Sequence, residues 1–295
     1  MKNMIKYFKY RLKWHLAPHF NFKSPVHVDI ELNNNCNQSC ASCWHSSDKL
    51  PFEIGFMSNN DIGCIFSYCI TNDIKSVKFN WRGEPLIDIG RLSLMSYLYN
   101  SENIYTMINT NGKNLKNNIG YLTDINEIII SVDSLEPHNY KVIHNEKIDF
   151  MLVLLKTLTL YKKENVLKNK IKLNFHDNKI NHEELKHSLK YYKKILGFPI
   201  ITRFTENREG KDLSIKREKK RKKVCSHMKR RLTVAANGKI FPCCVAYNEP
   251  DDLCLGTDIE KAWTSEKRIQ LIENYKIGLL TETCKKCTSG DTFRE

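Results

Sequence analysis

The chain of 295 residues predicts an α/β fold, in which a partial (β/α)6 barrel is followed by a small cysteine-rich C-terminal domain. Six short apolar segments with strand periodicity alternate with amphipathic segments of helical periodicity, which favours a parallel sheet with crossover helices. Distinctive polar residues mostly follow the strands, and parallel α/β folds bind ligands at the carboxyl ends of their strands. Most of the eleven cysteines fall into two groups, one near each end of the chain.

Composition limits the class of protein. Hydrophobic residues make up 41% of the chain, which is enough to bury a sizeable core. No apolar run approaches the length of a membrane span, and the N-terminus lacks the pattern of a signal peptide. We therefore expect a cytoplasmic protein. In that reducing compartment, clustered thiols indicate metal ligands rather than disulfides.

The sequence divides into four parts. Residues 1–25 form a basic segment with helical spacing, expected to pack on the body of the protein, with attachment to an acidic membrane surface as the alternative. Residues 26–204 hold the alternating pattern, and residues 225–295 hold the second cysteine group. Between them, residues 205–224 form a basic linker that includes the run Lys216 to Lys223. This run is interpreted as solvated, the alternatives being a patch for nucleic acid, an anionic substrate or an acidic protein.

The alternating region predicts its elements in a regular order. Strands are expected at residues 26–32, 76–81, 104–108, 125–132, 171–175 and 199–204. Helices are expected at residues 59–71, 89–98, 115–122, 149–163 and 182–196, and Asn60 is a candidate cap of the first. Three consecutive isoleucines in the fourth strand indicate burial on both faces of the sheet.

The segment that follows the first strand carries the strongest chemical signal. Cys36, Cys40 and Cys43 stand at C-x3-C-x2-C spacing in a short, Asn-rich stretch. Thiolates are soft ligands for iron–sulfur clusters and other thiophilic metals, so this loop supplies three of the four ligands that a cluster needs. A partial zinc site is the alternative, although zinc sites more often have paired C-x2-C knuckles.

A second candidate metal site lies in the C-terminal part. Asn-Gly between two apolar runs predicts a hairpin that ends at Cys243 and Cys244, and one helix is expected over residues 259–275. The four candidate ligands are Cys225, Cys243, Cys284 and Cys287. On spacing alone, zinc and an iron–sulfur cluster fit them about equally well, and Cys244 is an alternative to Cys243.

The first cysteine group resembles the signature of the radical S-adenosylmethionine (SAM) superfamily. In that family three cysteines hold three irons of a [4Fe–4S] cluster, and the fourth iron is left open for the amino and carboxylate groups of SAM. One departure is visible, because the family usually has an aromatic residue before the third cysteine. Here that residue is Ser42, and Trp44 follows the cysteine instead.

The strand ends extend this resemblance. Arg82-Gly83-Glu84-Pro85 is similar to the family's Gly-Gly-Glu-Pro segment, whose backbone meets the SAM amino group. Thr110-Asn111-Gly112 is similar to its Thr-Asn-Gly, and Ser131 with Asp133 to the Ser-x-Asp near the SAM carboxylate and ribose. Taken alone, the first two could be turns only. The resemblance implies a set of SAM-binding residues: Gly83, Glu84, Thr110, Asn111, Ser131, Asp133 and Asn174.

The partner of the SAM carboxylate is left open. Many relatives place an arginine about ten residues after the Ser-x-Asp pair, and the corresponding position here falls near His144. Arg82 or Arg203 could substitute for it. No general base is assigned, although Lys172, His176 and Arg203 lie on or near late strands where a substrate would bind.

The C-terminal cysteines resemble the SPASM/twitch extension of radical SAM enzymes. The shared features are a cysteine, a hairpin that ends Gly-x4-Cys, a Leu-Gly turn, a helix with Trp, and a final C-x2-C. The short twitch form, which holds one auxiliary [4Fe–4S] cluster, fits better than the full SPASM pattern. Cys254 then has no assigned role. The resemblance covers residues 26–287, nearly the whole chain.

The resemblance implies an oxidoreductase-type enzyme with two [4Fe–4S] clusters. Reductive cleavage of SAM would give a 5′-deoxyadenosyl radical that takes a hydrogen atom from the substrate, and the auxiliary cluster would accept an electron. A small carbohydrate- or aminocyclitol-like substrate is favoured, because fewer than thirty residues precede the first strand. Modification of a ribosomally made peptide or a protein side chain is the alternative. Flavodoxin or ferredoxin is the expected electron donor. A zinc-stabilised nucleic-acid-binding module is the remaining hypothesis, disfavoured because it leaves the ordered strand-end motifs unexplained.

Overall fold

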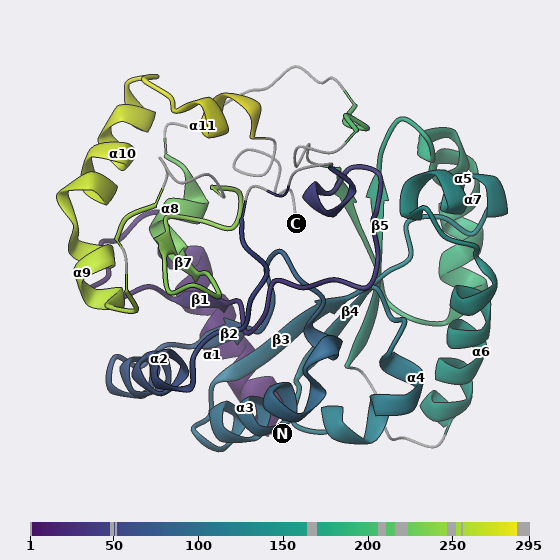
Figure 1. The fold of residues 1–295 in the computed structure, drawn as a ribbon, viewed down its shortest axis with the longest axis horizontal. Coiled ribbons are helices and arrows are strands. Elements are labelled where there is room, and N and C mark those ends of the chain that lie inside the picture. The colour runs from purple at the N-terminus through teal and green to yellow at the C-terminus, as the bar shows by residue number, and fades with distance from the viewer. Residues whose placement is uncertain are drawn as a thin grey trace.

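The computed structural model describes residues 2–47, 50, 52–163, 170–205, 211–215, 224–246, 252–254 and 256–287. The strands are β1 (His27–Ile30), β2 (Ser76–Lys78), β3 (Tyr105–Thr110), β4 (Glu127–Ser131), β5 (Ile171–Asp177), β6 (Ile200–Phe204), β7 (Arg231–Val234) and β8 (Ile240–Phe241). Within the described residues they form one sheet in the order β6-β5-β4-β3-β2-β1-β7-β8 (Figure 1). Strands β1 to β6 are all parallel, as the alternating pattern predicts.

The helices connect these strands in sequence. They are α1 (Lys2–Leu16), α2 (Asn59–Thr71), α3 (Ile89–Ser101), α4 (Leu115–Asn118), α5 (Pro137–His144), α6 (Asp149–Lys163), α7 (His182–Leu196), α8 (Ser226–Arg230), α9 (Ile259–Thr264), α10 (Glu266–Lys276) and α11 (Glu282–Lys286). Short 3-10 turns follow the first two strands, at Trp44–Ser46 and Pro85–Ile87, and a third, Ile119–Leu122, extends α4. The predicted α/β class and the partial barrel are confirmed.

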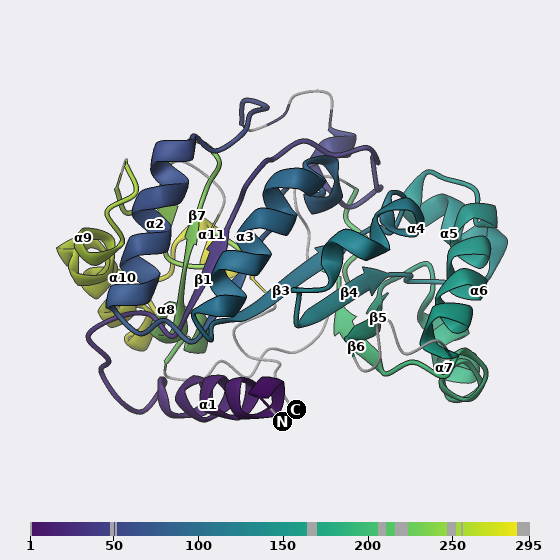
Figure 2. The ribbon, with the colours of Figure 1, turned by 90° about the horizontal axis from the view of Figure 1, so that it is seen from below.

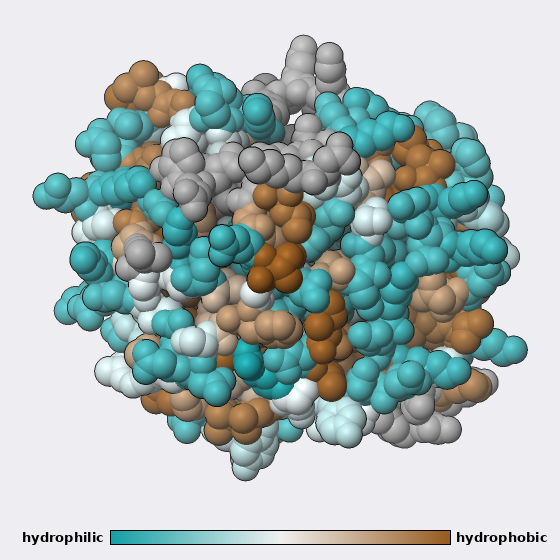
Figure 3. Space-filling model, in the orientation of Figure 1, coloured by the Kyte–Doolittle hydropathy of each residue, from teal (hydrophilic) through white to brown (hydrophobic). Residues whose placement is uncertain are grey.

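A large hydrophobic core lies between the sheet and most of the helices, and a separate cluster lies under α1. Strand β4 contributes the three buried isoleucines Ile128, Ile129 and Ile130, so this strand is buried on both faces as predicted. Fully burying a side chain of this size contributes roughly 1.5–3 kcal/mol. Buried Cys69 belongs to this core, whereas Cys64 on the same helix is exposed. Figure 3 shows that apolar side chains also gather near the centre of the face seen in Figure 1, between polar ones.

Several boundaries differ from the expectations. Ser58, not Asn60, caps α2, because its hydroxyl accepts a hydrogen bond from the Asp61 backbone N–H. Strand β2 ends at Lys78 instead of residue 81, and the expected helix over residues 259–275 is two helices. They meet at Ser265, whose hydroxyl caps the second by accepting from Arg268 N–H at 3.2 Å. Helix α5 was not expected.

The C-terminal segment shares the sheet of the barrel. Strand β7 pairs with β1 in parallel, from His27 opposite Arg231 to Ile30 opposite Val234. The predicted hairpin is present, since β8 pairs antiparallel with β7 through the turn at Gly238, whose φ of +80° favours glycine. The first strand of the chain therefore has β2 on one side and β7 on the other.

Helix α1 lies at the amino-terminal ends of the strands. The ring of Tyr10 stacks on Tyr105, the first residue of β3, at 5.9 Å between centroids. The ring of Trp14 meets His27, the first residue of β1, edge-on at 5.9 Å. Figure 2 shows the helix running along one side of the molecule, apart from the other helices. Packing of this segment on the body of the protein is as predicted.

The described residues contain no helix that is both long enough and apolar enough to span a bilayer. The basic run from Lys216 to Lys223 lies outside the described residues.

Candidate functional site

The loop with Cys36, Cys40 and Cys43 follows β1 and rests directly on the turn after β2. A Cβ atom at Gly83 would stand 2.6–2.7 Å from backbone atoms of Asn33, Asn34 and Asn35, so only glycine allows this approach. The Glu84 N–H donates to the Asn35 carbonyl at 2.8 Å. The two segments for which the resemblance implies contacts with the cluster and with SAM are thus held together through their backbones.

Glu84 joins this turn to the end of β3. Its carboxylate accepts hydrogen bonds from the Thr110 hydroxyl at 2.6 Å and from the backbone N–H groups of Asn111 and Leu86 at 2.9 and 3.1 Å. Burial raises the pKa of Glu84 to about 7, against the lowering effect of these donors. The Asn111 amide then donates to Asn37 in the cysteine loop at 2.8 Å. Glu84, Thr110 and Asn111 therefore fix the loop in place.

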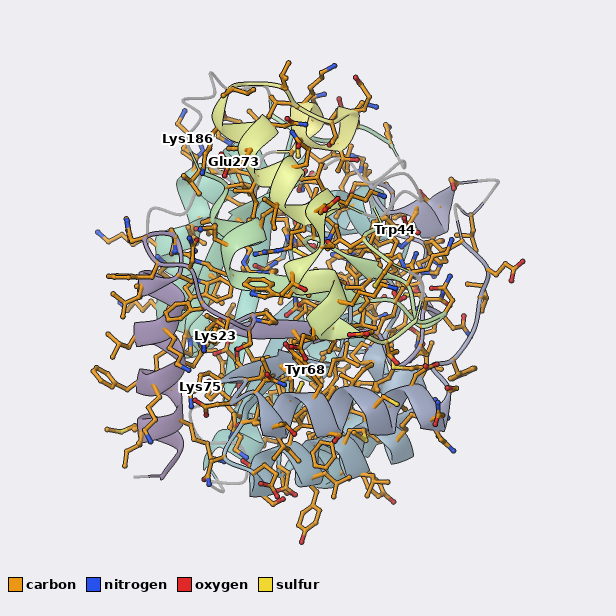
Figure 4. The ribbon with its side chains drawn as sticks, turned by 90° about the vertical axis from the view of Figure 1, so that its left-hand side faces the viewer. Lys23, Trp44, Tyr68, Lys75, Lys186 and Glu273 are labelled. Carbon is orange, nitrogen blue, oxygen red and sulfur yellow. The ribbon has the colours of Figure 1, made fainter. Side chains whose placement is uncertain are left out.

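The side chain of Arg82 makes an ion pair and two contacts with aromatic rings. Its guanidinium pairs with the buried carboxylate of Glu31, with Nη2 to Oε2 at 2.5 Å. The rings of Phe52 and Trp81 lie 4.2 Å from its Cζ. Its carbonyl accepts from the indole N–H of buried Trp44, labelled in Figure 4, at 3.4 Å. These contacts hold the Arg82 side chain within the fold.

His144, near which the resemblance places an arginine in relatives, lies at the end of α5. One ring nitrogen of His144 lies 3.4 Å from the Cys40 sulfur, and the other lies 3.2 Å from Oδ2 of Asp133. Oδ1 of Asp133 accepts from the backbone N–H of His176 at 2.7 Å and lies 3.0 Å from its Nδ1. Burial alone would raise the pKa of Asp133, but the two histidines hold it well below its usual value. A continuous polar chain thus leads from the cysteine loop to β5.

The contacts that link His144, Asp133 and His176 were not predicted from the sequence. A signal was available, because the period-two alternation of β5 places Asn174 and His176 on one face of the strand. Asn174 is buried, and within the described residues its Oδ1 accepts no hydrogen bond. A buried acceptor of this kind suits a ligand that donates a hydrogen bond. Ser131 is half-buried at the end of β4, directly opposite Asn174.

The structure brings the four C-terminal candidate ligands to one pocket. Cys225, Cys243, Cys284 and Cys287 all line it. Burial, together with Cys244, Cys225 and Cys287, raises the pKa of Cys243 well above its usual value. Burial likewise raises the pKa of Cys36 to about 12, with smaller contributions from Glu84, Cys40 and Cys43. Bound iron would offset the cost of burying the thiolates, since a coordinating metal deprotonates its thiols. Both thiol sets therefore fit a metal cluster.

Two further cysteines lie outside this pocket. The sulfur of Cys244 is 3.5 Å from the guanidinium of Arg231, and its carbonyl accepts from the Trp81 indole at 2.7 Å. Cys254 pairs with Ile240 in an isolated bridge. The geometry therefore favours Cys243 over Cys244 as a ligand.

Among the described residues, no three His, Cys, Asp or Glu side chains stand at the spacing of ligands around a single metal ion. In a four-iron cluster each thiolate binds a different iron, so its ligands stand farther apart.

A comparison with family models matches residues 225–288 to SPASM, an iron–sulfur cluster-binding domain. The C-terminal part of this chain is therefore similar to a SPASM domain. No curated protein matches.

Solved structures show the fold of the whole chain. BtrN in complex with AdoMet and 2-DOIA is 18% identical, with a TM-score of 0.61 over 90% of this chain and 93% of that one. anSMEcpe with AdoMet and the Cp18Cys peptide is 17% identical, with a TM-score of 0.61 over 89% and 86%. Streptococcus suis SuiB bound to its precursor peptide SuiA is 14% identical, with a TM-score of 0.59 over 96% and 74%. The chain thus has the fold of radical SAM enzymes that carry SPASM or twitch domains, as predicted.

Proposed function

We propose that this protein is a radical SAM enzyme that oxidises a small carbohydrate- or aminocyclitol-like molecule. When bound, the first cluster and SAM together supply a 5′-deoxyadenosyl radical that takes a hydrogen atom from the substrate. The observation that carries this proposal is the cysteine loop after β1, held against Gly83 at a distance that only glycine permits. Cys36, Cys40 and Cys43 would hold that cluster, and Cys225, Cys243, Cys284 and Cys287 the auxiliary one.

The proposed SAM-binding residues have different tasks. Gly83 offers its backbone, and Asn174 offers the buried Oδ1 that accepts no hydrogen bond within the described residues. Ser131 lies beside Asn174 on the next strand. Glu84, Thr110, Asn111 and Asp133 act mainly through other residues, because their side chains already hold the loop and the end of β5.

The residue best placed to take a proton from the substrate is His176. Its side chain is partly exposed, and Asp133 fixes its ring at one nitrogen. Oxidation of an alcohol to a ketone releases two electrons and two protons. One electron and one proton leave together as the abstracted hydrogen atom. The second proton would pass to the imidazole of His176, and the second electron to the auxiliary cluster.

The proposed substrate class is based on the molecules with which similar structures were solved. BtrN was solved with the small molecule 2-DOIA, and the match with this chain is nearly complete in both directions. SuiB and anSMEcpe were solved with peptides, so modification of a peptide is the second candidate function. Activity assays with aminocyclitols and with peptide precursors separate the two. Flavodoxin or ferredoxin is the proposed electron donor, and the cytoplasm the proposed location.

The test is replacement of Cys36, Cys40 and Cys43 by Ala, with anaerobic reconstitution of both proteins. Wild type should form 5′-deoxyadenosine after reduction, and the variant should form none while keeping the auxiliary cluster. An unchanged yield of 5′-deoxyadenosine would refute the assignment. Tightly bound zinc without iron in freshly purified anaerobic protein would instead support a zinc-stabilised module.

A further inference from the structure

Helix α1 has two apolar faces, and the fold uses one of them. Tyr10, Trp14 and Ala17 are buried against the sheet. Lys6 is also buried on this side, where its ammonium donates to the Asn100 carbonyl at 2.7 Å. These contacts fix the helix in one orientation on the amino-terminal ends of the strands.

The opposite face is apolar and exposed. Met4, Phe8 and Leu12 follow one another at four-residue spacing and are 76%, 67% and 50% exposed. Ile5 and Leu16 extend this stripe on the same side and are also exposed. At 100° per residue the five side chains cover an arc of roughly 120°, as wide as the apolar stripe that a helix usually buries. In Figure 4 the side chains of α1 project outward from the body of the protein. We call this set the outer stripe.

The segment that carries the outer stripe has charges of one sign, although Lys13 pairs with Asp73 from outside the segment. The sequence has no Asp or Glu before Asp29, whereas Lys and Arg occur six times before that residue. Lys9 is exposed, and so is Lys23, which Figure 4 labels beside the helix. Two copies of α1 packed face to face would bring these like charges together without acidic partners within the segment. An anionic surface complements them.

We propose that the outer stripe binds the surface of a bilayer that contains anionic phospholipids. An amphipathic helix with a basic border lies in the interface plane, with its apolar side chains at the acyl boundary and its amines among the phosphates. In this orientation the amino-terminal ends of the strands face the membrane. The carboxyl ends, where the cysteine loop lies, face away from it and stay open to substrate.

The experiment is co-sedimentation of the reconstituted protein with vesicles. One set contains equal parts of phosphatidylglycerol and phosphatidylcholine, and the other contains phosphatidylcholine alone. Wild type should bind the anionic vesicles, and added salt should weaken this binding. F8E/L12E places two carboxylates in the outer stripe and should weaken binding at least about tenfold, which corresponds to about 1.4 kcal/mol.

The matched control is Y191E/I195E. Tyr191 and Ile195 are exposed apolar residues with the same four-residue spacing on α7, which Figures 1 and 2 show apart from α1. This control should bind like wild type, and circular dichroism and iron content should show that both variants are folded.

Four outcomes would overturn the proposal. In the first, wild type binds the two vesicle types equally. In the second and third, F8E/L12E keeps its binding to anionic vesicles, or Y191E/I195E loses binding as much as F8E/L12E does. In the fourth, wild type does not bind vesicles but forms a dimer, which F8E/L12E converts to monomer.

Discussion

Gly83 is a residue that the structure does not allow to be replaced without a shift of the backbone. Three backbone atoms of the cysteine loop stand 2.6–2.7 Å from where its Cβ would lie, and backbone cannot turn aside as a flexible side chain can. We expect Gly83→Ala to displace the loop, to lower the free energy of unfolding by about 1–3 kcal/mol, and to reduce iron loading. Thermal unfolding and iron analysis measure the two effects.

Gly63 provides the control for this change. It is exposed within α2, and a Cβ added there would meet no neighbouring atom within 4 Å, so Gly63→Ala should stabilise the protein by up to about 1 kcal/mol. Wild-type stability and iron content in Gly83→Ala would show that the loop moves more easily than this packing indicates.

Asp133 provides a pH-dependent test at the same scale. Its φ is +61°, a region that Asn also accepts, so Asp133→Asn removes the charge without disturbing the backbone. The two histidines lower the pKa of Asp133 in the folded protein. Its ionised carboxylate therefore stabilises the folded state at pH values above the unfolded pKa of about 3.9. This stabilisation is lost as the pH falls from that value through the lower folded pKa. We expect the variant to be about 1–3 kcal/mol less stable at pH 7.

Urea unfolding over a series of pH values measures this difference. The gap between the two proteins should start to shrink below about pH 5. A gap that stays constant on acidification would mean that the ionised carboxylate is not what stabilises this region.

At the scale of the elements, Glu31 ties three segments together. It lies just beyond β1, pairs with Arg82 after β2, and accepts from the backbone N–H of Ala236 after β7 at 3.0 Å. Glu31→Gln leaves the buried guanidinium without a counter-charge, which costs about 3–5 kcal/mol. Chemical denaturation should show this loss. Glu31→Gln combined with Arg82→Met should recover much of it, and equal loss in the single and double variants would contradict the pairing.

The elements themselves were largely predictable from the sequence. Alternating periodicity located all six strands of the barrel, and α2, α6 and α7 have the predicted bounds. The pattern failed where the signal is short or local. Helix α5 has only eight residues, and the break at Ser265 depends on one capping hydroxyl. Periodicity also does not indicate which strands pair with each other, so the pairing of β7 with β1 could not be predicted.

The sequence predicted which segments meet at the candidate site, but not the contacts among their side chains. The spacing of the cysteines and the residues after each strand located the segments that meet in the fold. Spacing could not reveal that Arg82 turns to Glu31 or that His144 bridges Cys40 and Asp133, because these contacts depend on three-dimensional packing.

At the scale of the whole molecule, the two thiol sets belong to neighbouring parts of one sheet and should be separable by mutation. Reconstituted wild type should bind about eight irons, four in each cluster. Cys284→Ala with Cys287→Ala should reduce this to about four. Formation of 5′-deoxyadenosine should persist, because the first set is intact, while substrate oxidation should fall for lack of an electron acceptor.

Circular dichroism must accompany this measurement, since loss of a structural metal can unfold a small domain. A folded variant that oxidises substrate at the normal rate would show that the second cluster only stabilises the protein.

The place of β7 also affects how the chain is made. On the ribosome, β1 emerges early, but the strand that covers its free edge follows 204 residues later, the separation of His27 and Arg231. Since translation adds about 5–20 residues per second, this edge stays unpaired for roughly 10–40 s before β7 is synthesised. An uncovered strand edge can pair with other chains. Nascent molecules are therefore most prone to aggregate before their last quarter is synthesised, and any product truncated before β7 keeps that edge open permanently.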